Sequence, residues 1–403
     1  MSLLRSKRVL AGLGVLALSL SACVSAAPPD NNDGDQGGSG DGTIKIGAVM
    51  ASSGFMGPID TPAIESMKVE IEKINAEGGI DGQQVELALI DTGTKLERYA
   101  SAAKELLEQD AKVILVTCDY DVSSPASKAA EDANVLHIAP CVGDPIYGPQ
   151  GGWKIGFSMG AGNPGEASNM AEFSYDKGWR KAVTLTDTSL KYTQNQCEIF
   201  KKRFTELGGE VTANYDFSQG DSIRESVSRI ASGPAPDVIV NCSYNPGGGT
   251  AAKEIRDGGL NMPVISGFGQ DGDFWVGAIP NLKDYYVVTY ASKNGDDPDE
   301  AVNEMAAAVE KEFGKAPDVG GFVTGASTIQ AIKVAYEDAK SWDGDKLAAA
   351  MEKFDEVPLL AGPTSFSPEL HINVERPMRV MEVKDGKLVF VELRSPKKVT
   401  WAE

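Results

Sequence analysis

The stretch TIKIGAVMASSGFMGPIDTPAIESMKVEIEKINAEGGIDGQQVELALI, residues 43–90, decides the fold class of this chain. Residues 43–50 are an apolar run typical of a strand, and residues 84–90 are a second such run. Between them, residues 62–79 carry apolar side chains at helical spacing and end in two glycines, which stop a helix. A strand, a helix and a strand in this order predict two parallel strands joined by a crossover helix.

The same alternation continues to the end of the chain. A first series is completed by expected helices at 96–109 and 124–133 and strands at 112–117 and 135–140. A second series is expected to contain helices at 163–178, 190–207, 221–232 and up to Asp257, and strands at 181–186, 210–216, 237–242 and 263–268. The last third predicts strands at 285–290, 376–383 and 387–394 and helices at 297–313, 322–341 and 343–354.

These series predict an α/β protein of two doubly wound, Rossmann-like lobes joined by a hinge that the chain crosses several times. We expect the N-terminal lobe to comprise residues 43–158 plus 292–360, and the C-terminal lobe residues 159–291 plus 361–401. Ligands bind beyond the carboxyl ends of the strands in such sheets. A ligand cleft between the lobes is therefore expected.

The N-terminus is typical of an exported protein. Residues 1–22 combine a basic start, a short apolar run and small residues, which predicts a signal peptide. The sequence LSAC at 20–23 resembles the lipobox of bacterial lipoproteins, which implies a lipid on Cys23, although an ordinary export signal with an incidental cysteine is the alternative. Residues 23–42 form an acidic, Gly-rich tether with little to bury. We therefore expect a body anchored by lipid to the outer face of the cytoplasmic membrane.

Composition excludes several function classes. The formal net charge of −20 argues against a nucleic-acid partner and against direct adhesion to anionic lipid. Neither histidine belongs to a metal-ligand spacing, and His137, inside VLHIAP, is expected in the core. The sequence has neither a G-x-S-x-G nucleophile motif nor a phosphate loop, because NPGGGT at 245–250 lacks the lysine and is expected to shape a loop. No metal, cofactor or catalytic group is predicted.

The cysteine count fits an oxidising compartment. Apart from Cys23, four cysteines remain, and an even number in an exported chain favours two disulfides. Cys118 and Cys141 each follow one of two neighbouring parallel strands, which lie about 4.8 Å apart, within the reach of a disulfide. Cys197 and Cys242 would then be the second pair, although the sequence alone leaves the connectivity open.

Several segments resemble one family, the type I periplasmic solute-binding proteins. They are IKIGAVMASSG, EKINAEGGIDGQQVELALID, PASKAAEDANVLHIAP, GGLNMPVISG and GPTSFSPELHINVERPMRVMEVKDGKLVFVEL. The similarity spans roughly residues 43–395 and is strongest to the leucine/isoleucine/valine-binding branch that serves ABC importers. It implies a monomeric binding protein, not an enzyme, that delivers a small polar ligand to a permease in the membrane. An amino acid, a related amide or an aromatic acid is the implied ligand.

The resemblance also implies a ligand shell at the strand ends and in the cleft. The positions that match are Asp119, Tyr120, Asp121, Cys141, Gly143, Tyr192, Tyr244, Phe322 and Asp271, or Gln270 if the register slips by one. Tyr120 and Asp271 would reach the ligand from opposite lobes. Asp187, which ends a strand, is expected either at the cleft or as a helix cap.

Two departures weaken the case for an amino acid. Tyr120 and Gly143 stand where amino-acid binders of the family carry small hydroxyl residues, and Asp119 and Asp121 would repel a ligand carboxylate. Main-chain N–H groups of the helix expected near Ser123 could still bind an anion.

A ligand-sensing receptor of the same fold is one alternative function. A hydrolytic enzyme that uses the paired cleft carboxylates is another.

Overall fold

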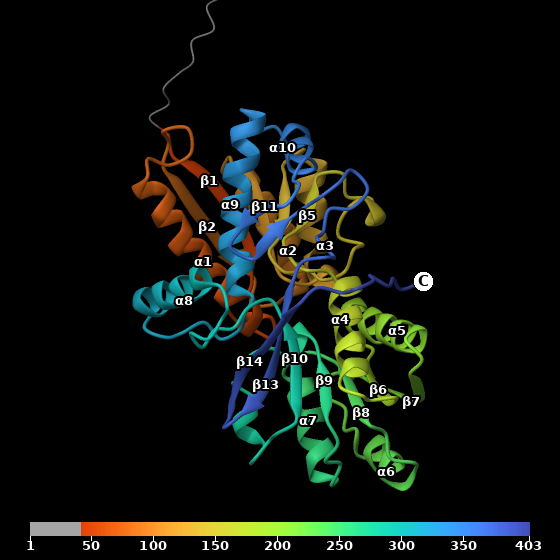
Figure 1. Ribbon diagram of the computed structural model, residues 1–403. Helices are drawn as coiled ribbons and strands as arrows, with labels where there is room; N and C mark the ends of the chain where they lie inside the picture. The colour runs from red at the N-terminus through yellow and green to blue at the C-terminus, as the bar shows by residue number, and fades with distance from the viewer. Residues whose placement is uncertain (1–41) are drawn as a thin grey trace, which may run out of the picture. The chain divides into compact units, whose positions relative to one another are not determined.

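The computed structural model describes residues 42–403. The predicted signal peptide, Cys23 and nearly all of the tether lie outside these residues. Within the described range, two parallel-stranded sheets with covering helices confirm the predicted α/β class (Figure 1). The expected lobe boundaries stay a prediction.

The first sheet contains five parallel strands of the described range in the order β2-β1-β3-β4-β5. Its strands are β1 (Ile44–Met50), β2 (Val85–Asp91), β3 (Val113–Val116), β4 (His137–Ala139) and β5 (Gly156–Ser158). The helices that alternate with them are α1 (Gly57–Ala76), α2 (Leu96–Glu108) and α3 (Tyr120–Asp132). Strand β3 is buried along its whole length, as expected for a parallel strand covered on both faces.

The second sheet contains seven strands of the described range in the order β14-β13-β10-β9-β8-β6-β7. Its parallel strands are β6 (Lys181–Asp187), β7 (Glu210–Phe217), β8 (Val238–Cys242), β9 (Val264–Ser266) and β10 (Tyr285–Thr289). The antiparallel pair β13 (Met378–Lys384) and β14 (Lys387–Arg394) extends it beside β10. Its helices are α4 (Asn163–Asp176), α5 (Lys191–Glu206), α6 (Arg224–Ser232) and α7 (Gly247–Asp257).

The last third of the chain returns to both sheets, as predicted. Helix α8 (Glu300–Phe313) packs on α1, and α9 (Phe322–Ala339) and α10 (Gly344–Met351) join the core of the first sheet, where α9 lies along α1 (Figure 1). The short pair β11 (Val357–Leu359) and β12 (Gly362–Thr364) follows, and the chain then enters β13 of the second sheet. The chain therefore passes between the sheets after β5, after β10 and before β13.

Two local predictions are wrong. The predicted strand 112–117 and helix 124–133 leave residues 119–121 in a loop, but α3 begins at Tyr120 because the Asp119 carboxylate accepts the Val122 N–H at 3.0 Å and caps the helix. NPGGGT was expected to shape a loop, but its glycines form the first turn of α7. A Cβ on Gly248 would meet the side chains of Gln270 and Ser243, so close packing explains that glycine.

The histidine and disulfide predictions are confirmed. His137 is fully buried, with its ring nitrogens 2.7 Å from the Tyr147 hydroxyl and 3.0 Å from a Glu131 carboxylate oxygen. Cys118 is bonded to Cys141, with 4.7 Å between their Cα atoms. Cys197 of α5 is bonded to Cys242 at the end of β8, at a Cα separation of 5.6 Å. The second bond fastens α5 to its own sheet.

Replacing Cys197 and Cys242 together by alanine should lower the free energy of unfolding by about 2–4 kcal/mol, because the denatured chain loses a loop constraint. Urea unfolding of the double variant measures this. As the control, the native chain and the double variant should reach the same, still lower midpoint under reductant, because Cys118–Cys141 is then broken in both. Equal midpoints for all samples, with free thiols at both positions in the untreated chain, would show the bond to be absent.

Candidate ligand-binding site

A pocket lies where the carboxyl ends of the first sheet meet the second. Each side contributes half of its lining. The first-sheet side supplies Met56, Ile59, Cys118, Asp119 and Cys141. The second-sheet side supplies Leu190, Tyr192, Tyr244, Phe268 and Gly269. This is the position that the doubly wound sheets predict for a ligand.

The pocket is mainly apolar, narrow and partly open to solvent. The disulfide Cys118–Cys141 forms part of its lining, and three aromatic rings come from the other side. The Phe268 ring is fixed from behind by stacking on Tyr290, at 4.3 Å between centroids. The cavity volume is about 40 Å³, which suits a water molecule rather than an organic ligand. Entry of a solute therefore requires the two sides to move apart, and the form that closes on the solute must leave more room between them than this structure does.

Asp60 organises the first-sheet side. This residue of α1 is fully buried, and burial raises the pKa of its carboxyl group to about 7. Its oxygens accept the Ala51 N–H at 2.9 Å, the Cys118 N–H at 3.0 Å and the Thr117 hydroxyl. These bonds join the ends of β1 and β3 to α1. They place Cys118, and with it Asp119, at the pocket.

Asp119 is the acid of the lining and is only 6% exposed. Burial raises the pKa of its carboxyl group to about 7, and repulsion from Asp121 adds to the effect. Its Oδ1 accepts the Val122 N–H at 3.0 Å as the helix cap, and the main chain of Asp121 also acts on this carboxylate and lowers its pKa. The other oxygen remains available to a ligand.

Glu166 of α4 organises the second-sheet side. Its Oε1 accepts the Tyr192 hydroxyl at 2.7 Å, the Phe268 N–H at 3.2 Å and the Gln196 side-chain amide. The Gly269 N–H donates to the Tyr192 oxygen at 3.1 Å. Complete burial raises the pKa of Glu166 to about 7. Tyr192 therefore presents its ring to the pocket while its hydroxyl is used within the protein.

Tyr244 differs from Tyr192 in this respect. It is 8% exposed, and no hydrogen bond within residues 42–403 acts on its hydroxyl. Burial, followed by the charges of Asp187 and Asp119, raises its pKa. Asp187 ends β6 and accepts the Ser189 N–H at 2.9 Å, so the helix-cap alternative is wrong, since α5 begins at Lys191. The Tyr244 hydroxyl is free to bind a ligand near two carboxylates.

Two aspartates of the first-sheet side bind the start of α5 across the pocket. Asp121 Oδ2 accepts the Lys191 N–H at 2.9 Å. Asp144, which follows β4, accepts the Asn195 side-chain amide at 2.6 Å. Both acids follow strands of the first sheet, whereas α5 belongs to the second. These two hydrogen bonds hold the pocket closed.

The structure brings five of the predicted ligand residues to the pocket or its rim. Asp119, Cys141, Tyr192 and Tyr244 line it, and Asp121 closes it. Gly143 lies behind Tyr192, where a Cβ would approach the ring to 2.9 Å, so the glycine permits this close contact.

Three predicted residues lie outside the lining. Tyr120 is half-buried at the start of α3, and Phe322 is fully buried at the start of α9. Asp271 is 3% exposed, and its carboxylate accepts the Thr289 hydroxyl at 2.5 Å and the N–H groups of Gly320 and Gly272 at 2.6 and 2.7 Å. Gln270 is also buried and donates to Asn245 at 3.4 Å. The Asp271 oxygens are thus already used inside the second half.

Four apolar residues of the pocket were missed, namely Met56, Ile59, Leu190 and Phe268. In the sequence they resemble core residues, and they are indeed nearly buried. A signal existed for Phe268, because it is the last residue of the predicted strand 263–268, at the end where ligands bind.

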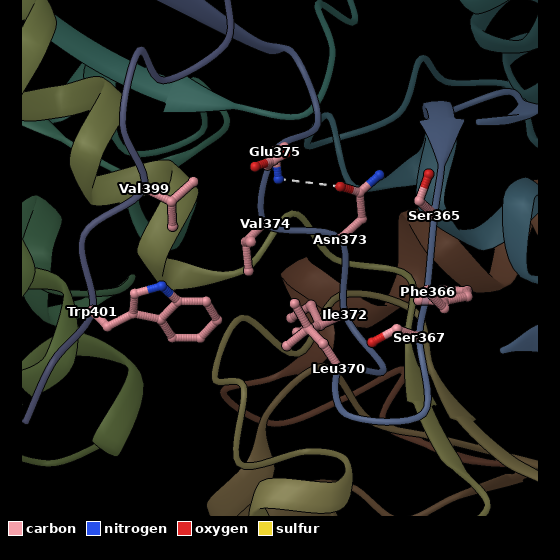
Figure 2. A pocket seen from close by; sticks show the side chains of 10 residues that line it. All are labelled: Ser365, Phe366, Ser367, Leu370, Ile372, Asn373, Val374, Glu375, Val399 and Trp401. Atoms are coloured by element: carbon pink, nitrogen blue, oxygen red, sulfur yellow. Dashed lines mark hydrogen bonds between the residues drawn. The ribbon is translucent and has the colours of Figure 1, made fainter. Parts of the chain in front are cut away.

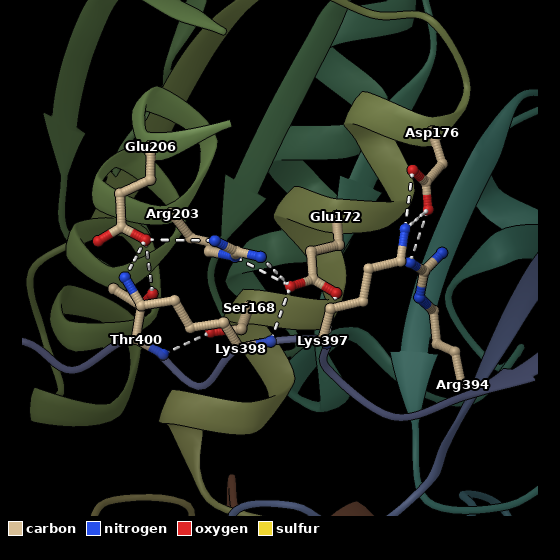
Figure 3. A network of polar contacts seen from close by, with 9 residues as sticks. All are labelled: Ser168, Glu172, Asp176, Arg203, Glu206, Arg394, Lys397, Lys398 and Thr400. Atoms are coloured by element: carbon tan, nitrogen blue, oxygen red, sulfur yellow. Dashed lines mark hydrogen bonds and ion pairs between the residues drawn. The ribbon is translucent and has the colours of Figure 1, made fainter. Parts of the chain in front are cut away.

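Two further surface features involve the C-terminal segment. A groove of about 310 Å³ lies between residues 365–375 and the tail, with Trp401 on one side and Leu370 and Ile372 on the other (Figure 2). The tail is fastened to α4, because Glu172 accepts the Lys397 N–H at 2.7 Å and Ser168 accepts the Thr400 N–H at 2.9 Å (Figure 3). Neither feature shares a lining residue with the pocket described above.

Across residues 42–403, every helix is too short or too polar to cross a membrane. The same residues contain no group of three or more histidine, cysteine or acidic side chains that could hold a metal ion.

Fold and site together define a two-sided binding protein, and comparison with known proteins agrees. The profile of the family described as periplasmic binding protein matches residues 43–387, so the chain belongs to that family. The Leu/Ile/Val-binding protein BraC3 of Rhizobium johnstonii is 22% identical over 356 residues, which is 88% of this chain and 93% of BraC3.

Solved structures share the fold. The branched-chain amino acid transporter substrate-binding protein LivJ of Streptococcus pneumoniae, in complex with isoleucine, superimposes with a TM-score of 0.78 at 21% identity, covering 88% of this chain and 100% of LivJ. A solute-binding protein of an ABC transporter from R. palustris, in complex with benzoate, gives a TM-score of 0.73 at 21% identity, covering 88% and 97%.

Replacing Asp121 and Asn195 by alanine should favour an open form. Each lost hydrogen bond raises the free energy of the closed form by about 0.5–1.5 kcal/mol. Small-angle scattering of the unliganded chain should give a larger radius of gyration than for the native chain. Asp132→Ala, an exposed change on the same helix as Asp121, is the control. Identical scattering of the double variant and the native chain would contradict the assigned role.

Proposed function

We propose that this chain is an extracytoplasmic solute-binding protein that captures a small organic ligand in the pocket between its sheets and delivers it to an ABC permease. The observation that carries the proposal is the pocket itself, lined half from each sheet and closed by hydrogen bonds from one side to the other. A protein that closes on its ligand can present the closed form as the signal for docking.

The ligand is small and has an apolar or aromatic part, which the disulfide and the rings of the pocket would contact. The sequence predicts amino acids, amides and aromatic acids. Isoleucine and benzoate are held by the two related structures named above. These compounds therefore form the starting panel for a search.

A lipid on Cys23 would hold the protein at the membrane that contains the permease. The basic start, the apolar run and the LSAC motif support export and lipid attachment, and the tether would leave the body free to turn. We propose that the mature chain is a monomer on the outer face of the cytoplasmic membrane.

A ligand from the panel should stabilise the full chain and be recovered unchanged. At 100 times its dissociation constant a ligand contributes about 2.7 kcal/mol to the free energy of unfolding. Thermal unfolding of ligand-stripped protein measures this gain, and chromatography of the released compound tests for turnover. Formation of a product would favour the hydrolytic alternative. A panel without any stabilising compound would contradict the proposal.

Cys23→Ala should abolish lipid attachment and release the protein from membranes, because the thiol is the attachment site that the lipobox implies. Ser25→Ala, two residues beyond the motif, is the matched control and should stay in the membrane fraction. Cell fractionation and the mass of the N-terminal peptide provide the measurement. A Cys23→Ala protein that remains lipid-modified would refute the anchor.

A further inference from the structure

The pocket offers negative charge without a basic side chain to balance it. Asp119 is the one acid among its lining residues, all within the described part of the chain, and none of them is a lysine, arginine or histidine. Asp121 and Asp144 stand on the same side, and Asp187 acts on Tyr244 from the other. Lys191 is exposed, and its charge acts on Asp144. A ligand carboxylate would find no cationic partner in the lining.

Two main-chain groups at the start of α3 that could bind a carboxylate are already used. At the start of α3 the Val122 N–H donates to the Asp119 carboxylate at 3.0 Å, and the Ser123 N–H donates to the Asp119 carbonyl at 2.9 Å. The carboxylate of the protein itself therefore stands at the helix start. A ligand carboxylate placed there would be repelled and would lose its hydration without compensation.

Two polar groups of the pocket are without protein partners and come from opposite sides. They are the second oxygen of Asp119 and the hydroxyl of Tyr244, in residues that are 6% and 8% exposed. Both atoms keep some exposure, so a ligand in the pocket can reach them. An ammonium group carries three donors and a positive charge. It could donate to both oxygens at once when the pocket is closed.

The rest of the lining favours a hydrocarbon or a ring. Met56, Ile59, Leu190 and Phe268 contribute apolar atoms, and the disulfide adds two sulfur atoms. Sulfur contacts aromatic rings favourably. The faces of tyrosine rings attract cations. An amine on an apolar body thus matches every group in the pocket.

We infer that the ligand is a small organic amine with an apolar or aromatic body and without a carboxylate. The inference rests on the proposed solute-binding function and concerns the same pocket. It departs from the amino acids and aromatic acids that the resemblance implies, because the carboxylate of Asp119 itself takes the Val122 N–H at the start of α3.

Matched pairs of compounds isolate the carboxylate. 2-Phenylethylamine is phenylalanine without its carboxylate, and 3-methylbutylamine is leucine without it. Calorimetry with the full chain at pH 8 and 0.15 M salt should give each amine at least about tenfold tighter binding than its amino acid, since the like-charge contact with Asp119 is removed.

Variants identify the acid. Asp119→Asn keeps a good helix cap and should weaken amine binding about tenfold or more. Asp187→Asn, which keeps its bond with Ser189, is a second variant and should weaken binding less. Asp132→Asn, an exposed change on α3, should leave the affinity unchanged. Unfolding temperatures close to the native value would confirm that the variants are folded.

Other outcomes separate this inference from the proposed function. Amino acids or benzoate that bind as tightly as the amines would overturn the inference and leave solute binding intact. Amine binding that is indifferent to both Asp119→Asn and Asp187→Asn would also overturn it. A chain that binds no compound of either class would contradict both the inference and the proposed function.

Discussion

The buried carboxylate of Asp60 is the contact on which the pocket depends. It joins the segment after β1, the end of β3 and α1 through hydrogen bonds to Ala51, Thr117 and Cys118. Cys118 is in turn bonded to Cys141 after β4, and the next residue, Asp119, caps α3. The Asp60 side chain thus joins α1 to the ends of β1 and β3, and the disulfide and the Asp119 cap extend this connection to β4 and α3. A buried acid that accepts several hydrogen bonds can do this without a basic partner.

The second half also contains a buried carboxylate that accepts several hydrogen bonds. Glu166 is also completely buried and gathers Tyr192, Gln196 and Phe268 around one oxygen. Burial raises the pKa of both acids to about 7, so each carries less charge near neutrality than a surface acid does. Two rigid half-pockets result, and the two can move relative to one another because neither acid bridges them.

The sequence predicted what depends on local pattern. Apolar runs and helical spacing gave the parallel strands and their helices, and the spacing of neighbouring strands gave the Cys118–Cys141 bond. The pocket depends on which side chains face it, and this is a long-range property. Met56 and Phe268 could not be separated from core residues by type. The sequence could not show that the Asp271 carboxylate is already bonded to Thr289 and Gly320, because these residues lie far from it in the chain.

Closure and ligand choice follow from the same electrostatics. Asp121 and Asp144 meet the N-terminal turns of α5, where the helix dipole and the Lys191 N–H offer partial positive charge. In the closed form, α5 of the second half therefore stabilises Asp121 and Asp144 of the first half. No basic side chain of the lining takes part. That arrangement leaves Asp119 uncompensated inside the closed pocket. A cationic ligand would balance the charge of Asp119 and contact the second half at the same time only when the two halves close on it. Such a ligand would therefore shift the equilibrium toward a closed form.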